Sequence, residues 1–195
     1  VIARATPEIT TPPTASVIVY GQPLSAASLS GGAASTSGIF AFTNPDLTPE
    51  GGIANQSVTF TPADTANYDV VLLDVSVSVA PLVTALGATQ VLADIGGSVT
   101  FVVEVAGAVG PLDFQWYRIT EDKALSPVLD ANEPSLTLSS LTMDDALDYQ
   151  CEVNDTSTGL ISWSPIFTVT FGAGLPAASL FGLLMVAALS AITGA

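Results

Sequence analysis

The chain has 195 residues, with 3 Lys and Arg against 18 Asp and Glu, one Cys and no His, and its formal net charge is −15. Without histidine it cannot form a Ser-His-Asp triad, a Cys-His dyad or a His-ligated zinc site. One cysteine excludes an intrachain disulfide, and the excess of acid opposes binding to nucleic-acid phosphates. We therefore expect no enzyme, no catalytic residues, no cofactor and no nucleic-acid partner.

Charge divides the chain into three segments. Residues 1–80 carry six acids and Arg4, residues 81–171 carry twelve acids with Arg118 and Lys123, and residues 172–195 carry no charge. The length suits one large or two small domains, so we predict domains at 1–80 and 81–171 followed by an apolar tail. Because the sequence opens at Val1 without a signal segment, we expect a processed form or a fragment of a longer protein.

Short runs rich in Val, Ile, Thr, Phe and Tyr alternate with Gly, Pro, Asn and Asp clusters, which predicts an all-β fold. The expected strands are 15–20, 38–43, 56–61, 68–79, 89–93, 98–105, 112–118, 135–138, 148–154 and 163–171. The run before Val79 alternates strictly with Asp74, Ser76 and Ser78, so one face of that strand should be wet. After Pro62, the Asp64 side chain should close a turn on its own backbone.

The first segment contains PTASVIVYGQPLSAASLSGG at 13–32, GIFAFTNPDLTPEGG at 38–52 and QSVTFTPADTANYDVV at 56–71. These runs resemble the bacterial surface repeat of the MBG type, over about residues 6–80. The resemblance implies a small β domain of an extracellular stalk or adhesin, without catalytic residues. Some relatives are linked with mucin binding, so it implies a glycan, mucin or protein ligand as the partner.

Two tyrosines of this segment are candidate ligand contacts. Tyr20 and Tyr68 could each offer a ring face on which a sugar stacks. The alternative is that both are half-buried aromatics at strand ends, with the hydroxyl in water. The residues alone leave both interpretations open.

The second segment contains DFQWYRI at 113–119, SLTLSS at 135–140 and DDALDYQC at 144–151. This combination resembles an immunoglobulin-like domain, which implies a β-sandwich. Trp116 then occupies the core position of strand C, and Tyr149 forms a tyrosine corner with Asp145 in the preceding turn. Val103 stands where the partner of Cys151 would be, so Cys151 has no disulfide mate.

Cys151 has two interpretations. It is either a buried, unreactive thiol packed on Trp116, as free cysteines commonly are, or a redox-active or intermolecular thiol, which would need a neighbouring cation. We favour the first. The acidic clusters at 121–122 and 144–148 lack the spacing of an EF-hand, so we expect no metal site, with calcium binding as the alternative.

The tail at 175–195 reads LPAASLFGLLMVAALSAITGA and carries no charge. As a helix it would reach about 30 Å, the thickness of a bilayer core, and it resembles the sorting tails of bacterial surface proteins. We predict a hydrophobic helix that spans or anchors in a membrane. The alternatives are a helix docked on the domains and an apolar tail removed in maturation.

Together these features predict a non-catalytic bacterial cell-surface module. We expect it to serve adhesion or ligand presentation on a stalk that is anchored to the membrane or envelope at the C-terminus. One alternative is a passive structural spacer. The other is the accessory C-terminal region of a larger secreted enzyme.

Overall fold

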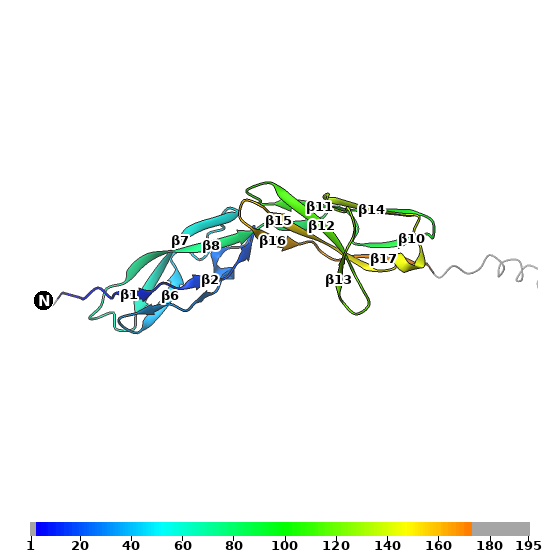
Figure 1. Ribbon diagram of the computed structural model, residues 1–195. Helices are drawn as coiled ribbons and strands as arrows, with labels where there is room; N and C mark the ends of the chain where they lie inside the picture. The colour runs from blue at the N-terminus through cyan, green and yellow to red at the C-terminus, as the bar shows by residue number, and fades with distance from the viewer. Residues whose placement is uncertain (1–2, 173–195) are drawn as a thin grey trace, which may run out of the picture.

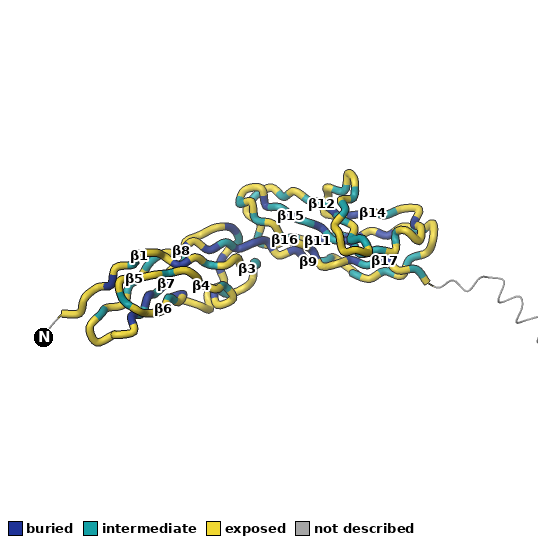
Figure 2. Tube along the Cα trace, turned by 60° about the horizontal axis from the view of Figure 1, so that its bottom comes forward, coloured by how far each residue is buried: buried dark blue, intermediate teal, exposed yellow. Residues whose placement is uncertain are grey.

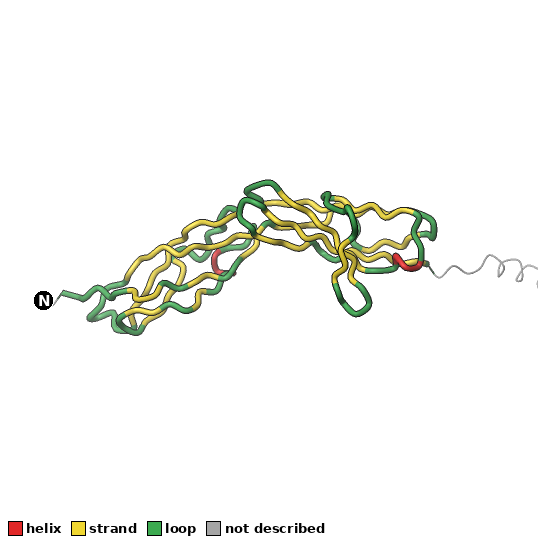
Figure 3. Tube along the Cα trace, viewed as in Figure 1, coloured by secondary structure: helices red, strands yellow, loops and turns green. Residues whose placement is uncertain are grey.

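The computed structural model describes residues 3–172, and these residues form β-strands joined by turns, with two short 3-10 helices (Figures 1 and 3). The all-β prediction is confirmed for this part of the chain. The helix predicted at 175–195 lies outside the described residues. Across residues 3–172, no helix combines the length and the apolar composition needed to cross a membrane.

The N-terminal unit is built on a four-stranded sheet in the order β3-β8-β7-β6, with two small ladders, β1–β5 and β2–β4. Its elements are β1 (Ile9–Thr11), β2 (Thr14–Ala15), β3 (Ile18–Val19), η1 (Leu24–Ala26), β4 (Leu29–Ser30), β5 (Ala33–Ala34), β6 (Gly38–Phe42), β7 (Gly52–Pro62) and β8 (Val71–Ala80). Along β8, Val75 and Val77 are buried while Asp74 and Ser76 are exposed, which confirms the predicted alternation. The buried face packs with Ile18 and Leu24 into one core.

The C-terminal unit has a six-stranded and a three-stranded sheet around one shared core, which gives it a sandwich-like character. Its elements are β9 (Leu82–Ala85), β10 (Gln90–Ala93), β11 (Ser98–Ala106), β12 (Leu112–Ile119), β13 (Leu125–Pro127), β14 (Ser135–Ser139), η2 (Met143–Asp145), β15 (Asp148–Asp155), β16 (Leu160–Trp163) and β17 (Phe167–Phe171). The larger sheet runs β10-β17-β15-β12-β13, with β16 also paired to β15, and the smaller runs β14-β11-β9.

Four of the predicted strands are wrong in extent. The run 56–61 is part of the longer β7, which begins four residues earlier, at Gly52. The run 15–20 is split into β2, which pairs with β4, and β3, which pairs in parallel with β8. The run 163–171 is split at Pro165, whose missing N–H cannot join a ladder, so that β16 and β17 pair with different parts of β15. The run 68–79 begins as a strand only at Val71, because Tyr68 makes an isolated bridge to Ala5.

The two units lie end to end, and Pro81 is the sole residue between the end of β8 and the start of β9 (Figure 1). Residues 71–85 are therefore almost continuously extended, and at about 3.3 Å per residue they span roughly 50 Å. Ala80 and Pro81 are buried where the units meet, as the dark segment between them shows in Figure 2. The first strand lies toward one end of the molecule and β17 toward the other.

Candidate functional site

The structure brings the five predicted core residues into the C-terminal unit. Trp116, Val103, Tyr149 and Cys151 share one hydrophobic cluster, and the Trp116 side chain is fully buried against Phe167, with ring centroids 5.4 Å apart. The indole Nε1 donates a hydrogen bond of 2.9 Å to the carbonyl of Glu133. A buried tryptophan with its N–H satisfied stabilises a core rather than binding a ligand.

The turn before β15 holds Tyr149 and Asp145 together as predicted. The Tyr149 hydroxyl donates to the carbonyl oxygen of Asp145 at 3.3 Å. The Asp145 carboxylate accepts hydrogen bonds from the backbone N–H and the hydroxyl of Thr142, at 2.8 and 3.0 Å. Burial, with a further contribution from Asp145, raises the pKa of Tyr149 to about 12. This hydroxyl therefore stays protonated and acts as a fixed donor.

Cys151 lies directly opposite Trp116 in the β12–β15 ladder and is fully buried. Burial raises the pKa of its thiol to about 12. The thiolate is the reactive form of cysteine, and a thiol with so high a pKa forms almost none at neutral pH. The predicted buried thiol is confirmed.

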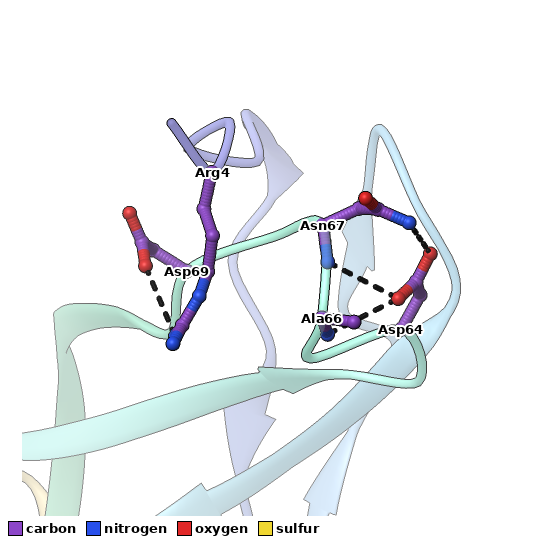
Figure 4. Close-up of polar contacts among 5 residues, drawn as sticks. All are labelled: Arg4, Asp64, Ala66, Asn67 and Asp69. Carbon is purple, nitrogen blue, oxygen red and sulfur yellow. Dashed lines mark hydrogen bonds and ion pairs between the residues drawn. The ribbon is translucent and has the colours of Figure 1, made fainter. Parts of the chain in front are cut away.

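Tyr68 bridges Ala5 near the start of the N-terminal unit. It directly follows a turn that forms as predicted, with Asp64 bonded to Ala66 and Asn67 (Figure 4). There, Asp64 Oδ1 accepts from the backbone N–H groups of Ala66 and Asn67 at 3.1 and 3.2 Å, and Oδ2 accepts from the Asn67 amide at 2.8 Å. The Asn67 side-chain and backbone hydrogen bonds, with that of Ala66, hold the pKa of Asp64 below its usual value. Tyr68 is half-buried, and its role as a ligand contact stays a prediction.

Tyr20 lies at the other end of β8, where its backbone N–H donates to Ala80 at 2.8 Å. The ten residues of β8 separate the two tyrosines by roughly 30 Å, so one small ligand could not touch both. The Tyr20 ring packs instead against Gly107 of the C-terminal unit, and a side chain at Gly107 would overlap it. The Tyr20 ring therefore contributes to the contact between the two units, and its role as a ligand contact stays a prediction.

The contact between the two units, which we call the junction, depends on close backbone approach. The Gly107 carbonyl lies where a Cβ at Gly51 would be, and a Cβ at Gly52 would lie 2.7 Å from Val109 Cγ2. The Ser162 hydroxyl of β16 donates to the carbonyl of Pro81 at 2.6 Å. The glycine contacts join the two units directly, and the Ser162 bond fixes the single linking residue to the C-terminal unit.

Asp155 holds the loop that carries Gly107 and Val109. Its side chain is only 1% exposed, and its carboxylate accepts from the backbone N–H of Val109 at 2.7 Å and of Ser157 at 3.0 Å. These backbone hydrogen bonds, with Val109 the largest contributor, lower the pKa of Asp155. Sequence reasoning missed this residue because nothing in the order Asn154-Asp155-Thr156 shows that Val109, 46 residues away, supplies one of its donors.

The outer face of the six-stranded sheet is a second candidate site that sequence reasoning missed. Tyr117 on β12 and Trp163 on β16 flank β15, and their rings meet with centroids 5.6 Å apart and planes at 49°. Trp163 is 38% exposed and Ile161, two residues earlier on the same face, is 52% exposed. The sequence signal for this face is the alternation of Ile161 and Trp163 on one side of a strand. The predicted strand at 163–171 begins too late to include Ile161, so the alternation was not recognised.

Comparison with known proteins gives no match: no protein-family model and no curated protein matches this chain. Within residues 3–172, no three or more His, Cys, Asp and Glu side chains gather in a group that could hold a metal ion. The junction and the outer face of the six-stranded sheet are therefore the two candidate functional features of residues 3–172.

Proposed function

We propose that this chain is a non-catalytic module of a bacterial cell surface, in which an MBG-type repeat and an immunoglobulin-like domain form a stiff, extended spacer. Its task is to present whatever adjoins its N-terminal end at a distance from the surface. The proposal that residues 175–195 tether the chain to a membrane or envelope rests on their sequence, because they lie outside the described residues.

The junction is the single observation that supports a stiff spacer. Two domains joined by a flexible linker reorient freely, whereas a one-residue linker beside close contacts between the domains restricts bending. Gly51 and Gly107 meet backbone to backbone, and Ser162 bonds the linking Pro81. An end-to-end arrangement with restricted bending keeps the two ends of the molecule at a fixed separation.

Energy transfer in vesicles tests the proposal. The full chain carries a donor dye at its N-terminus, and the lipids carry an acceptor. We expect the chain to float together with the vesicles, which reports the tether. Energy transfer from the N-terminal dye to the lipids should be low in the parent chain. It should increase in Gly107→Ala, because the added Cβ would overlap Tyr20 and loosen the junction.

Gly96→Ala is the matched control. Both glycines have positive φ, +73° and +80°, but no atom lies within 4 Å of a Cβ at Gly96. Equal transfer in the parent and in Gly107→Ala would contradict a stiff junction. Failure to float would contradict the tether instead.

Ligand binding is the second candidate function, and the outward-facing Tyr117–Trp163 pair, in which Trp163 is exposed, favours it. Aromatic side chains that combine apolar area with a polar tip are enriched at interfaces. A module that binds a ligand through this face would serve adhesion, while the junction holds the face in place.

A further inference from the structure

The ring pair and its neighbours form an outward surface that no part of residues 3–172 covers with another sheet. Tyr117 stands opposite Gln150, and Trp163 stands opposite Glu152, in the two ladders of β15. Asn154 continues the same face between Asp113 and Ile161. We call these residues, Asp113, Tyr117, Glu152, Asn154, Ile161 and Trp163, the aromatic face.

The acids of the aromatic face lack cationic partners. Within residues 3–172 the recorded ion pair is Arg4 with Asp69, in the other unit. Arg118 follows Tyr117 by one residue and so points to the opposite side of its strand, and Lys123 lies in the turn before β13. Asp113 and Glu152 therefore give the aromatic face a negative potential that no lysine or arginine of this face offsets.

We infer that the aromatic face binds a basic, partly apolar protein segment, with Trp163 and Tyr117 as its apolar anchors and Glu152 and Asp113 as its charge partners. This inference deepens the second candidate function, since it names the partner class of that face, and the spacer role does not depend on it. A lysine or arginine of the partner can lie over the indole or phenol ring while a carboxylate pairs with it. Apolar side chains of the partner then cover Ile161.

Charge decides against other occupants. A second copy of the chain brings its own net charge of −15 to the contact, and nucleic acids and anionic lipids present the same sign, so that each is repelled. A partner with alternating basic and apolar side chains matches both the period of a sheet face and its charge. Such an interface is steered electrostatically and should weaken as salt is added.

The binding test uses the full chain in detergent and a fluorescein-labelled peptide of alternating arginine and leucine, followed by anisotropy. We expect saturable binding that protects Trp163 from acrylamide quenching. Trp116 is fully buried, so the quenchable emission of the parent reports on Trp163. A peptide of alternating glutamate and leucine, and a neutral cello-oligosaccharide, serve as the alternative ligands.

Four variants locate the site. Trp163→Ala should raise Kd at least about tenfold, as loss of an interface anchor does. Glu152→Gln keeps the shape of the side chain and should raise Kd severalfold while it flattens the salt dependence. Asp74→Asn and Leu72→Ala remove an exposed acid and a 65% exposed leucine from the N-terminal unit and should leave Kd unchanged.

Three results would overturn the inference. If Asp74→Asn weakened binding as much as Glu152→Gln did and Trp163→Ala had no effect, the peptide would be held by net charge alone. Equal binding of the acidic peptide would remove the charge argument. Protection of Trp163 by the oligosaccharide but not by the basic peptide would make the aromatic face a glycan site. None of these results bears on the stiffness of the junction.

Discussion

At the scale of single residues, buried polar side chains join segments that are distant in the sequence. Asp155 connects the turn after β15 to the loop that meets the N-terminal unit, and Ser164 fills a gap in the ladder beside Cys151. Ser164 provides the acceptor for the buried N–H of Cys151, and the buried Asp155 carboxylate is paired with the backbone N–H groups of Val109 and Ser157. A buried polar group that loses its partner is costly. Their loss should therefore be measurable in the free energy of unfolding.

Asp155→Asn should lower the free energy of unfolding by about 1.5–3 kcal/mol at pH 7, because the amide replaces an ionised acceptor. The pKa of Asp155 is lower in the folded than in the unfolded chain, where aspartate has a pKa of about 3.9. The stabilisation is thus present above about pH 4 and is lost as the pH falls through the lowered pKa. Urea unfolding between pH 7 and pH 2 checks it: the difference between parent and variant should shrink only at the acid end.

Cys151 should not react with a thiol reagent in the folded chain, because its side chain is buried and its pKa is about 12. The absorbance of the thionitrobenzoate that the reagent releases measures the rate of Cys151 labelling with and without urea. Reaction should start only on unfolding, and the Trp116 emission should change with it. Rapid labelling without urea would revive the reactive-thiol interpretation.

At the scale of elements, periodicity predicted the long strands and failed for the short ones. The alternation in β8 is strong because every second residue from Val71 to Val79 is apolar, and Val75, Val77 and Val79 are buried. In contrast, β1, β2, β4 and β5 have two or three residues each, too few to show a period, and their pairing depends on the tertiary fold. The tyrosine turn was predictable because its residues are close in sequence.

Beside the break between β16 and β17 at Pro165, the Ser164 side chain takes the place of a ladder hydrogen bond. At Ser164 the hydroxyl accepts from the backbone N–H of Cys151 at 2.9 Å and donates to the carbonyl of Pro165 at 2.8 Å. Ser164→Ala should cost about 1–3 kcal/mol, because a buried N–H loses its acceptor. Thermal and urea unfolding measure this, with Ser76→Ala on the exposed face of β8 as the control, for which we expect a change within about 0.5 kcal/mol. Equal losses in both variants would show that the Ser164 bond adds nothing.

At the scale of the whole molecule, composition predicted two β segments but not how they meet. Each hydrophobic cluster is local to one segment, so its strands could be read from apolar runs. The junction could not, because it consists of glycines that approach side chains far away in sequence, Gly107 with Tyr20 and Gly52 with Val109. A glycine in a sequence indicates a permissive backbone without a side chain. Only the fold shows where the missing side chain allows another segment to approach closely.

The junction should hold the two units in one orientation. Spin labels at Leu72→Cys and Leu129→Cys, both at strongly exposed positions, report the distance between the units by double electron–electron resonance. Native Cys151 should remain unlabelled. We expect one narrow distance distribution in this doubly labelled chain and in its Gly96→Ala variant, and a broad one in Gly107→Ala. A broad distribution in the doubly labelled chain itself would contradict the account.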